Sequence, residues 1–154
     1  MALFNVRVYG ILIDSQDRLL VSDEFIRGAY ITKLPGGGLE IGEGTRDGLA
    51  REFMEEANLE VKVGEHFYTT DFFQISAFNN TDQIISIYYR VYSDKTETIV
   101  AKEKAFDFLP EQVADKTETA EHLRWIALNE LSEETMTLPI DKVAIKMLLD
   151  QRRF

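Results

Sequence analysis

The residues best suited to chemistry in this sequence are glutamates at helical spacing. Glu52, Glu55 and Glu56 stand at positions i, i+3 and i+4, so on an α-helix they share one arc about 100° wide. Their carboxylate oxygens are the ligands that hard cations such as Mg²⁺ and Mn²⁺ prefer. The same spacing also suits a solvated helix face, because glutamate forms helices well and exposed like charges repel weakly. The cluster alone leaves both interpretations open.

A glycine-rich segment comes directly before these acids. Five glycines fall between positions 36 and 44, in LPGGGLEIGEG, and they allow the backbone to turn tightly and to approach a ligand closely. A lone glycine turn would be typical of a hairpin. Here the segment leads into the acidic run and adds Glu40 and Glu43. Glycines and carboxylates therefore gather in one place, which favours a divalent-cation site.

The composition limits what such a site can bind. The chain of 154 residues has 27 acidic and 17 basic residues and a net charge of -10, which repels a nucleic acid polymer. A small phosphorylated ligand remains compatible if a divalent cation bridges it to the protein.

The absence of cysteine excludes disulfides, thiolate zinc sites and a catalytic thiol. No segment has the roughly 18 to 20 apolar residues of a membrane span and no signal peptide is visible, so we expect a cytoplasmic protein without a membrane partner.

Hydrophobic periodicity predicts the elements that position these residues. A helix is expected from Thr45 to Ala57, with Thr45 as its N-cap and Asp47 in its first turn. A second helix begins near Pro139, and residues 94–119 form a long excursion that is partly extended. Strands are expected at 3–14 and 19–22 as a first hairpin, and at 29–34, 60–73, 83–93 and 122–128. We therefore predict one α/β domain, residues 1–154, with a mixed sheet.

From Gly37 onward the sequence resembles the signature of the Nudix hydrolases, G-x5-E-x7-R-E-U-x-E-E-x-G-U. Glu43 follows after five residues, and after seven more comes the block REFMEEANL. Phe53 stands where the signature has an aliphatic residue, and Asn58 stands where it has glycine. We expect Asn58 to end the helix in the left-handed conformation, which asparagine reaches more easily than most residues. The resemblance extends loosely over most of the chain, but only this segment is specific.

The resemblance implies a fold and an activity. Members of the family fold as an α/β/α sandwich around a mixed sheet and hydrolyse a nucleoside diphosphate linked to another group, with Mg²⁺ or Mn²⁺. We therefore expect a Nudix pyrophosphohydrolase acting on a small nucleotide, which could be a nucleotide sugar, an ADP-ribose type compound or a noncanonical nucleoside triphosphate. The alternative is a noncatalytic Nudix domain that senses a nucleotide. A homodimer is left open.

The resemblance also assigns roles to residues. Glu55 and Glu56 are expected to be principal metal ligands, with Glu52 as a further ligand or as the general base. The backbone carbonyl of Gly37 is expected to be another ligand. Arg51 is expected to pair with Glu43 and to hold the loop on the helix.

Further roles are expected outside the acidic helix. Many relatives use one more acid from the loop before the last strand, for which the candidates are Glu118, which we favour, and Glu121. Arg27 and Lys33 are cations that could either meet substrate phosphate or be solvated. Substrate binding is expected from Arg27, Gly36, Gly37 and Gly38.

Overall fold

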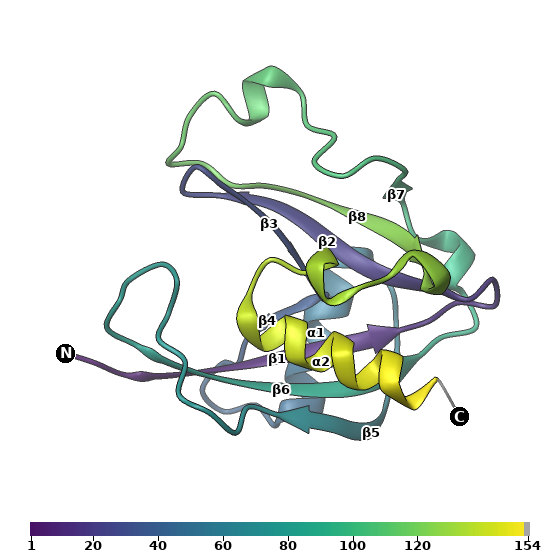
Figure 1. Ribbon diagram of the computed structural model, residues 1–154, viewed down its shortest axis with the longest axis horizontal. Helices are drawn as coiled ribbons and strands as arrows, with labels where there is room; N and C mark the ends of the chain where they lie inside the picture. The colour runs from purple at the N-terminus through teal and green to yellow at the C-terminus, as the bar shows by residue number, and fades with distance from the viewer. Residues whose placement is uncertain (153–154) are drawn as a thin grey trace. The chain divides into compact units, whose positions relative to one another are not determined.

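The computed structural model describes residues 1–152, and these form two compact units (Figure 1). The first unit contains Met1–Leu12 and Pro35–Ile99, and the second contains Ile13–Leu34 and the chain from Val100 onward. Each unit has a four-stranded sheet and one α-helix. That residues 1–154 act as a single domain stays a prediction.

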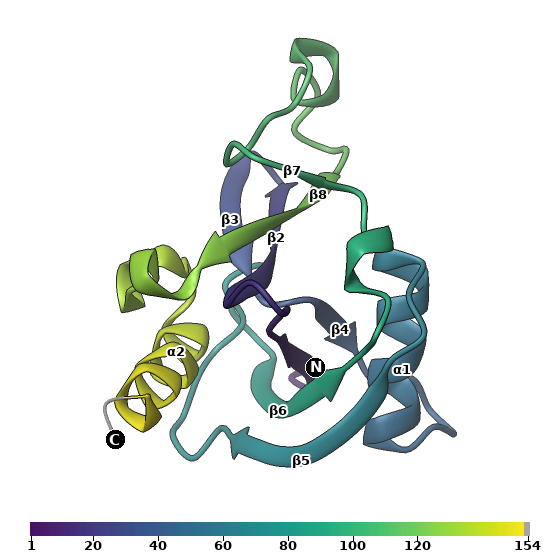
Figure 2. The same ribbon diagram turned by 90° about the vertical axis from the view of Figure 1, so that its right-hand side faces the viewer.

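The sheet of the first unit has the strand order β4-β1-β6-β5. Its strands are β1 (Phe4–Leu12), β4 (Gly36–Gly38), β5 (Lys62–Thr69) and β6 (Gln83–Tyr92). β1 pairs with β6 in parallel and with β4 antiparallel, so the sheet is mixed. Helix α1 (Thr45–Ala57) lies beside this sheet (Figure 2) and buries Leu49 and Phe53 completely. A Cβ atom on Gly10 of β1 would stand 2.5 Å from the Phe53 ring, so glycine lets the strand approach the helix.

The ends of α1 test two predictions about capping. Asn58 has φ 48° and ψ 42°, its N–H donates to the Met54 carbonyl and the N–H of Leu59 donates to the Phe53 carbonyl, which confirms Asn58 as the left-handed C-cap. The prediction of Thr45 as the N-cap is wrong, because Gly44 has the extended backbone and Thr45 is the first helical residue. The Thr45 hydroxyl instead contacts the Tyr89 hydroxyl of β6 at 2.7 Å. This side chain therefore ties the helix to the sheet.

The sheet of the second unit has the strand order β3-β2-β8-β7, and only β7 and β8 are parallel. Its strands are β2 (Arg18–Ile26), β3 (Ala29–Lys33), β7 (Ala101–Lys102) and β8 (Ala120–Ala127). Helix α2 (Pro139–Gln151) buries Ile140, Ala144, Ile145 and Leu148. The remaining elements are the 3₁₀-helices η1 (Thr96–Thr98), η2 (Pro110–Gln112), η3 (Leu128–Glu130) and η4 (Glu133–Thr135). Within residues 1–152 there is no helix long and apolar enough to cross a membrane.

The α/β class with mixed strand pairing is confirmed, but the pairing is divided between two sheets. The predicted first hairpin is confirmed only at its turn, where Ile13 and Leu19 form an isolated antiparallel bridge and the N–H of Asp14 donates to the Arg18 carbonyl. The expected pairing of the two long strands is wrong, because β1 and β2 belong to different sheets. Instead, β1 pairs with β6 in parallel along its whole length, from Phe4 to Leu12. Local alternation predicted the two strands correctly, whereas the choice of partner depends on residues far away in the sequence.

Candidate active site

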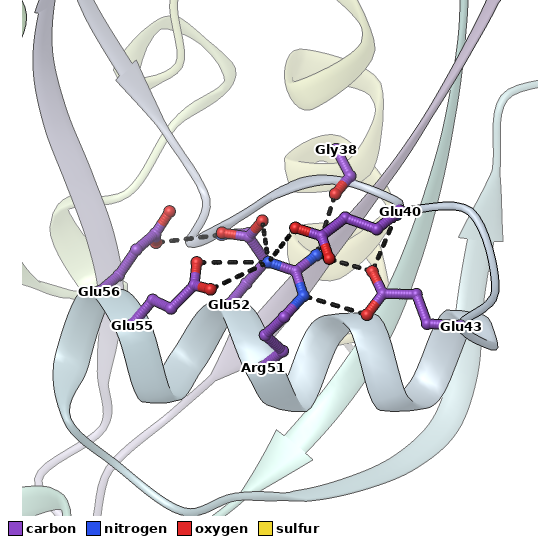
Figure 3. Close-up of polar contacts among 8 residues, drawn as sticks. Gly38, Glu40, Glu43, Arg51, Glu52, Glu55 and Glu56 are labelled. Atoms are coloured by element: carbon purple, nitrogen blue, oxygen red, sulfur yellow. Dashed lines mark hydrogen bonds and ion pairs between the residues drawn. The ribbon is translucent and has the colours of Figure 1, made fainter.

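Four glutamates gather around the guanidinium group of Arg51 (Figure 3), namely Glu40, Glu43, Glu52 and Glu55. Arg51 donates through Nη2 to one oxygen of Glu43 at 2.7 Å and through Nε to the other at 3.0 Å. The predicted pairing is therefore confirmed as a two-bond contact, which is the strong geometry for arginine and carboxylate. Nη2 also donates to the Gly38 carbonyl at 3.1 Å. Arg51 thus holds the glycine loop against the helix.

The other edge of the same guanidinium faces three further glutamates. Arg51 Nη1 lies 3.1 Å from Glu52, 3.2 Å from Glu55 and 3.7 Å from Glu40. Together with Glu43, four carboxylates share one positive charge. The site therefore carries a local excess of negative charge, which a divalent cation would offset.

The pKa values of Glu43 and Arg51 reflect their pairing. The hydrogen bond from Arg51, assisted by the backbone N–H of Glu40, lowers the pKa of Glu43 from 4.5 to about 2. The same hydrogen bond, with those to Glu52 and Glu55, raises the pKa of Arg51. Both groups therefore stay charged across the physiological range, which suits a structural contact and not a proton transfer.

The glycines of β4 bring the backbone close to the acids of α1. A Cβ atom on Gly37 would stand 2.6 Å from Oε1 of Glu52, so only glycine allows this carboxylate to rest on the strand. The N–H of Gly36 donates to Oε2 of Glu56 at 3.3 Å. Gly36 has φ +145°, and a Cβ atom there would collide with the backbone of Val8 at 2.0 Å. The glycine sequence is therefore required by both the turn and the site.

The strand register decides which backbone groups of β4 face the acids. The carbonyl of Pro35 accepts a hydrogen bond from β1, and the N–H of Leu39 donates one to it. In an antiparallel ladder, hydrogen-bonded positions alternate, so Gly37 midway between them also turns its N–H and carbonyl toward β1. Gly36 and Gly38 turn theirs toward the free edge of the strand. The contacts of those two residues with Glu56 and Arg51 agree with this alternation.

This register opposes one sequence-based expectation. The carbonyl of Gly37 was expected to be a metal ligand, but it points along the sheet toward Val8 of β1. The backbone of Gly36 is the one turned toward Glu56. Gly37 contributes through its missing side chain, and the neighbouring Gly36 carbonyl is the better candidate for a backbone ligand.

The donors at this site suit a hard divalent cation. They are carboxylates and backbone oxygens, as Mg²⁺ and Mn²⁺ require. In the described part of the chain, however, no three acidic, histidine or cysteine side chains already stand in a metal-binding group. Arg51 Nη1 contacts Glu52 and Glu55, which keeps their oxygens directed to the guanidinium. A bound cation would coordinate the oxygens of Glu52 and Glu55 in place of Arg51 Nη1, while the hydrogen bonds between Arg51 and Glu43 would remain.

The remaining predicted residues lie in the second unit. Glu118 is in the loop before β8, where its N–H donates to the Asp115 carbonyl, and Arg27 is in the turn after β2 with φ 48°. Their roles in catalysis and substrate binding stay predictions. Lys33 is neither solvated nor exposed, because its ammonium group forms a buried ion pair with Glu24 at 3.1 Å.

Sequence reasoning overlooked Arg7 of β1. Its Cα lies opposite Gly38 in the ladder, and its guanidinium lies close to that glycine. The available signal was that Arg7 is the one charged residue of β1. Its position beside the glycine strand follows only from the β1–β4 register.

Comparisons with known proteins agree with the fold and identify the family. The NUDIX domain profile matches residues 3–148. The structure resembles the E. coli ORF135 protein, with a TM-score of 0.67 and 18% identity over 99% of this chain and 92% of that one. It also resembles the MutT protein from Methanosarcina mazei, with a TM-score of 0.65 and 19% identity over 97% and 95% of the two chains.

A further similar structure is an ADP-ribose pyrophosphatase from Streptococcus suis, with a TM-score of 0.56 and 16% identity over 97% of this chain and 92% of that one. At such identities the solved structures support the Nudix-type α/β fold alone. None of the curated proteins compared with the chain matches it. Because the domain profile covers nearly the whole sequence, the chain belongs to the Nudix family, and the predicted enzyme class, a Nudix pyrophosphohydrolase, is supported.

Proposed function

We propose that the protein hydrolyses the pyrophosphate bond of a small nucleoside diphosphate derivative with Mg²⁺ or Mn²⁺. The observation that carries the proposal is the excess of carboxylates around Arg51, beside the glycine strand β4, within a Nudix domain. The substrate would be a nucleotide sugar, an ADP-ribose type compound or a noncanonical nucleoside triphosphate. A nucleic acid polymer is disfavoured by the charge of -10.

The residues of the first unit have distinct proposed roles. Glu55 and Glu56 would hold the cation with Glu52 and the carbonyl of Gly36. A divalent ion bound there neutralises phosphate oxygens and makes a bound water more acidic. Glu52, which rests on Gly37, would serve either as a further ligand or as the general base that accepts a proton from the attacking water, a role that contributes about 10²- to 10⁴-fold.

Other residues position the site or complete it. Arg51 and Glu43 orient the glycine loop and take no proton. The backbone of Gly36, Gly37 and Gly38 would contribute to substrate binding, because these glycines let the chain lie close to the acids of α1. Glu118 would supply a further acid and Arg27 a cation for the substrate. A single Nudix domain in the cytoplasm, without a membrane partner and with a homodimer left open, is part of the same proposal.

A substrate panel tests the function directly. Purified protein is incubated with nucleotide sugars, ADP-ribose and noncanonical nucleoside triphosphates, with Mg²⁺ or Mn²⁺, and the products are identified by mass. We expect cleavage of at least one compound at the pyrophosphate bond. Failure to cleave any compound of a broad panel, while a nucleotide still binds, would support the noncatalytic sensing domain instead.

Two matched variants assign the turnover to the acidic cluster. Glu56→Gln removes one proposed ligand, and we expect kcat to fall about 10³-fold, because metal-ion stabilisation of the transition state is worth several kcal/mol. Glu60→Gln removes an exposed charge just beyond the same helix and should leave kcat within about twofold. Equal activity of the two variants would refute the assignment of Glu56.

A further inference from the structure

We infer that one end of the first unit binds a second copy of this chain, through an apolar surface formed by β1 and by residues 70–82, which connect β5 to β6. The inference goes beyond the proposed function and needs no bound substrate. Two phenylalanines at this end, Phe4 and Phe73, are exposed over 68% and 70% of their surface. Three further residues of the connection, Phe72, Ile75 and Phe78, are exposed over 36% to 39%. We call these five residues the apolar end.

Strand pairing brings Phe4 and the connection together. Gln83 at the start of β6 lies opposite Phe4 on one side and forms an isolated antiparallel bridge with Ile75 on the other. Residues that lie opposite each other in neighbouring strands point to the same face of the sheet. The side chains of Phe4 and Ile75 therefore share one face, with Gln83 between them. The other three phenylalanines of the apolar end lie within three residues of Ile75 along the chain.

Helix α1 leaves this end of the sheet uncovered. Gly10 of β1 faces the helix, because a Cβ atom on it would stand 2.5 Å from the Phe53 ring. Alternate residues of a strand share a face, so Val8, Val6 and Phe4 lie on the same side as Gly10. Val8 is fully buried, Val6 is half-buried and Phe4 is exposed. The apolar face of β1 therefore continues beyond the helix into solvent.

The surroundings of the apolar end carry very few charges. Residues 72–84 include one charged side chain, Asp82, and residues 1–6 include none, although 29% of the chain is charged. The carboxylate of Asp82 accepts hydrogen bonds from the N–H of Leu3 and from the side chain of Asn79. The cores of protein interfaces are likewise depleted of charge and rich in aromatic residues. Because the chain has a net charge of -10, two copies approach each other most easily where the charge is lowest.

The size and shape of the apolar end fit a protein partner better than a small ligand. A buried aromatic side chain covers about 150 to 250 Å², so the exposed parts of the five residues offer on the order of 500 Å². Apolar patches of this size on a protein surface mark interaction sites. With a polar rim, a contact that is about 60% apolar would reach roughly 800 Å² per partner, the size of a standard interface. Small-molecule sites are concave and enclose their ligand, whereas Phe4 and Phe73 are mostly exposed.

The polar residues beside the apolar end suit a second copy in particular. Around a two-fold axis a surface meets itself, so charged groups near the axis would face like charges. The polar side chains next to the apolar residues are mainly uncharged amides, those of Gln74, Asn79, Asn80 and Gln83. An amide both donates and accepts hydrogen bonds, so it can pair with the same kind of group on another copy. The surface is therefore self-complementary.

Sedimentation of the full chain at about 1 to 100 µM tests the inference, because interfaces of standard size have dissociation constants in the micromolar range or below. We expect the mass of two chains at the upper concentrations. Phe73→Ser should raise the dissociation constant at least about 100-fold, because the ring is lost from both copies at once. The control is Val100→Ser, which removes an apolar side chain that is 90% exposed in the second unit and should dimerise like wild type.

Three results would overturn the inference. The first is a wild-type chain that stays monomeric at all these concentrations. The second is a dimer with an unchanged dissociation constant in both Phe73→Ser and Phe4→Ser, because it would form through another surface. The third is a higher KM in Phe73→Ser with an unchanged mass, because the surface would then bind the substrate.

The two phenylalanine variants also protect the test from misfolding. Circular dichroism shows whether each variant is folded, and Phe4→Ser replaces Phe73→Ser if the latter is not. Failure to hydrolyse any substrate would refute only the proposed function, because the sedimentation measurements do not depend on turnover.

Discussion

Two arginines, each surrounded by polar groups, show how the two units use charge differently. Arg124 of the second unit forms two hydrogen bonds with Asp23, at 2.6 Å and 2.9 Å, and Asp23 also accepts one from the Thr32 hydroxyl. Asp23 is completely buried, and its carboxylate meets the single guanidinium of Arg124, with the His122 ring 3.7 Å away. Arg51 of the first unit faces four glutamates, and its Nη1 contacts more oxygens than one donor group can satisfy well.

This difference in charge balance distinguishes a structural ion pair, Arg124 with Asp23, from a site whose carboxylates could bind a cation in place of Arg51. A buried pair with matched charge and complete hydrogen bonds gains nothing from a further cation, and losing either partner is costly. The glutamates around Arg51 are partly exposed, with 57% of the Glu55 side chain accessible, and their charge is not balanced. Excess carboxylate near a glycine backbone is therefore the feature on which the proposed metal site rests.

The largest effect on stability is expected from Asp23→Asn. The substitution leaves the largely buried Arg124 without its counter-charge, so we expect the free energy of unfolding to fall by about 3 to 5 kcal/mol. Urea denaturation measures the change. The control is Glu134→Gln, which breaks an ion pair with Lys142 in the same unit but at a side chain that is 85% exposed, and should cost about 0 to 1 kcal/mol.

Equal costs for these two substitutions would contradict the contrast between buried and exposed pairs. A small effect of Asp23→Asn would show that Arg124 finds another partner or water. In that case the network of the second unit would resemble the exchangeable site of the first.

A smaller effect on the free energy of unfolding is expected from Glu43, and this effect should depend on pH. Its folded-state pKa is lowered from 4.5 to about 2, so its stabilising contribution is fully present above 4.5 and is lost as the pH falls toward 2. The difference in unfolding free energy between wild type and Glu43→Gln should therefore be constant above about pH 5 and should shrink below it. Denaturation at pH 6 and pH 3 measures this, and added salt should reduce the difference because the pair is near the surface. A difference that does not change with pH would contradict the pairing with Arg51.

Sequence alone predicted the features that depend on neighbouring residues. The bounds of α1, Asp47 in its first turn and the left-handed Asn58 follow from local periodicity and backbone preference. The pairing of Arg51 with Glu43 came from a family resemblance, and the structure confirms it. These features needed no knowledge of which strands pair.

The features that depend on distant pairing could not be predicted. β1 pairs with β6 in another part of the sequence and not with β2, and only the β1–β4 register shows that the carbonyl of Gly37 points away from the acids. The same register places Arg7 at Gly38. The burial of Lys33 with Glu24 depends instead on a local pairing, the register of the β2–β3 hairpin, which the sequence analysis did not predict. Hydrophobic patterns indicate strands but do not specify their partners.

The most direct test of the account is a calorimetric titration of Mn²⁺ into wild type, Glu56→Gln and Glu60→Gln without substrate. If the carboxylates around Arg51 hold the cation, Glu56→Gln should weaken Mn²⁺ binding at least about tenfold, since removing one carboxylate ligand lowers the charge of the site. Glu60→Gln should bind like wild type, because its side chain lies outside the cluster. The same Mn²⁺ affinity in Glu56→Gln and wild type would contradict a metal-binding role for the acidic face of α1.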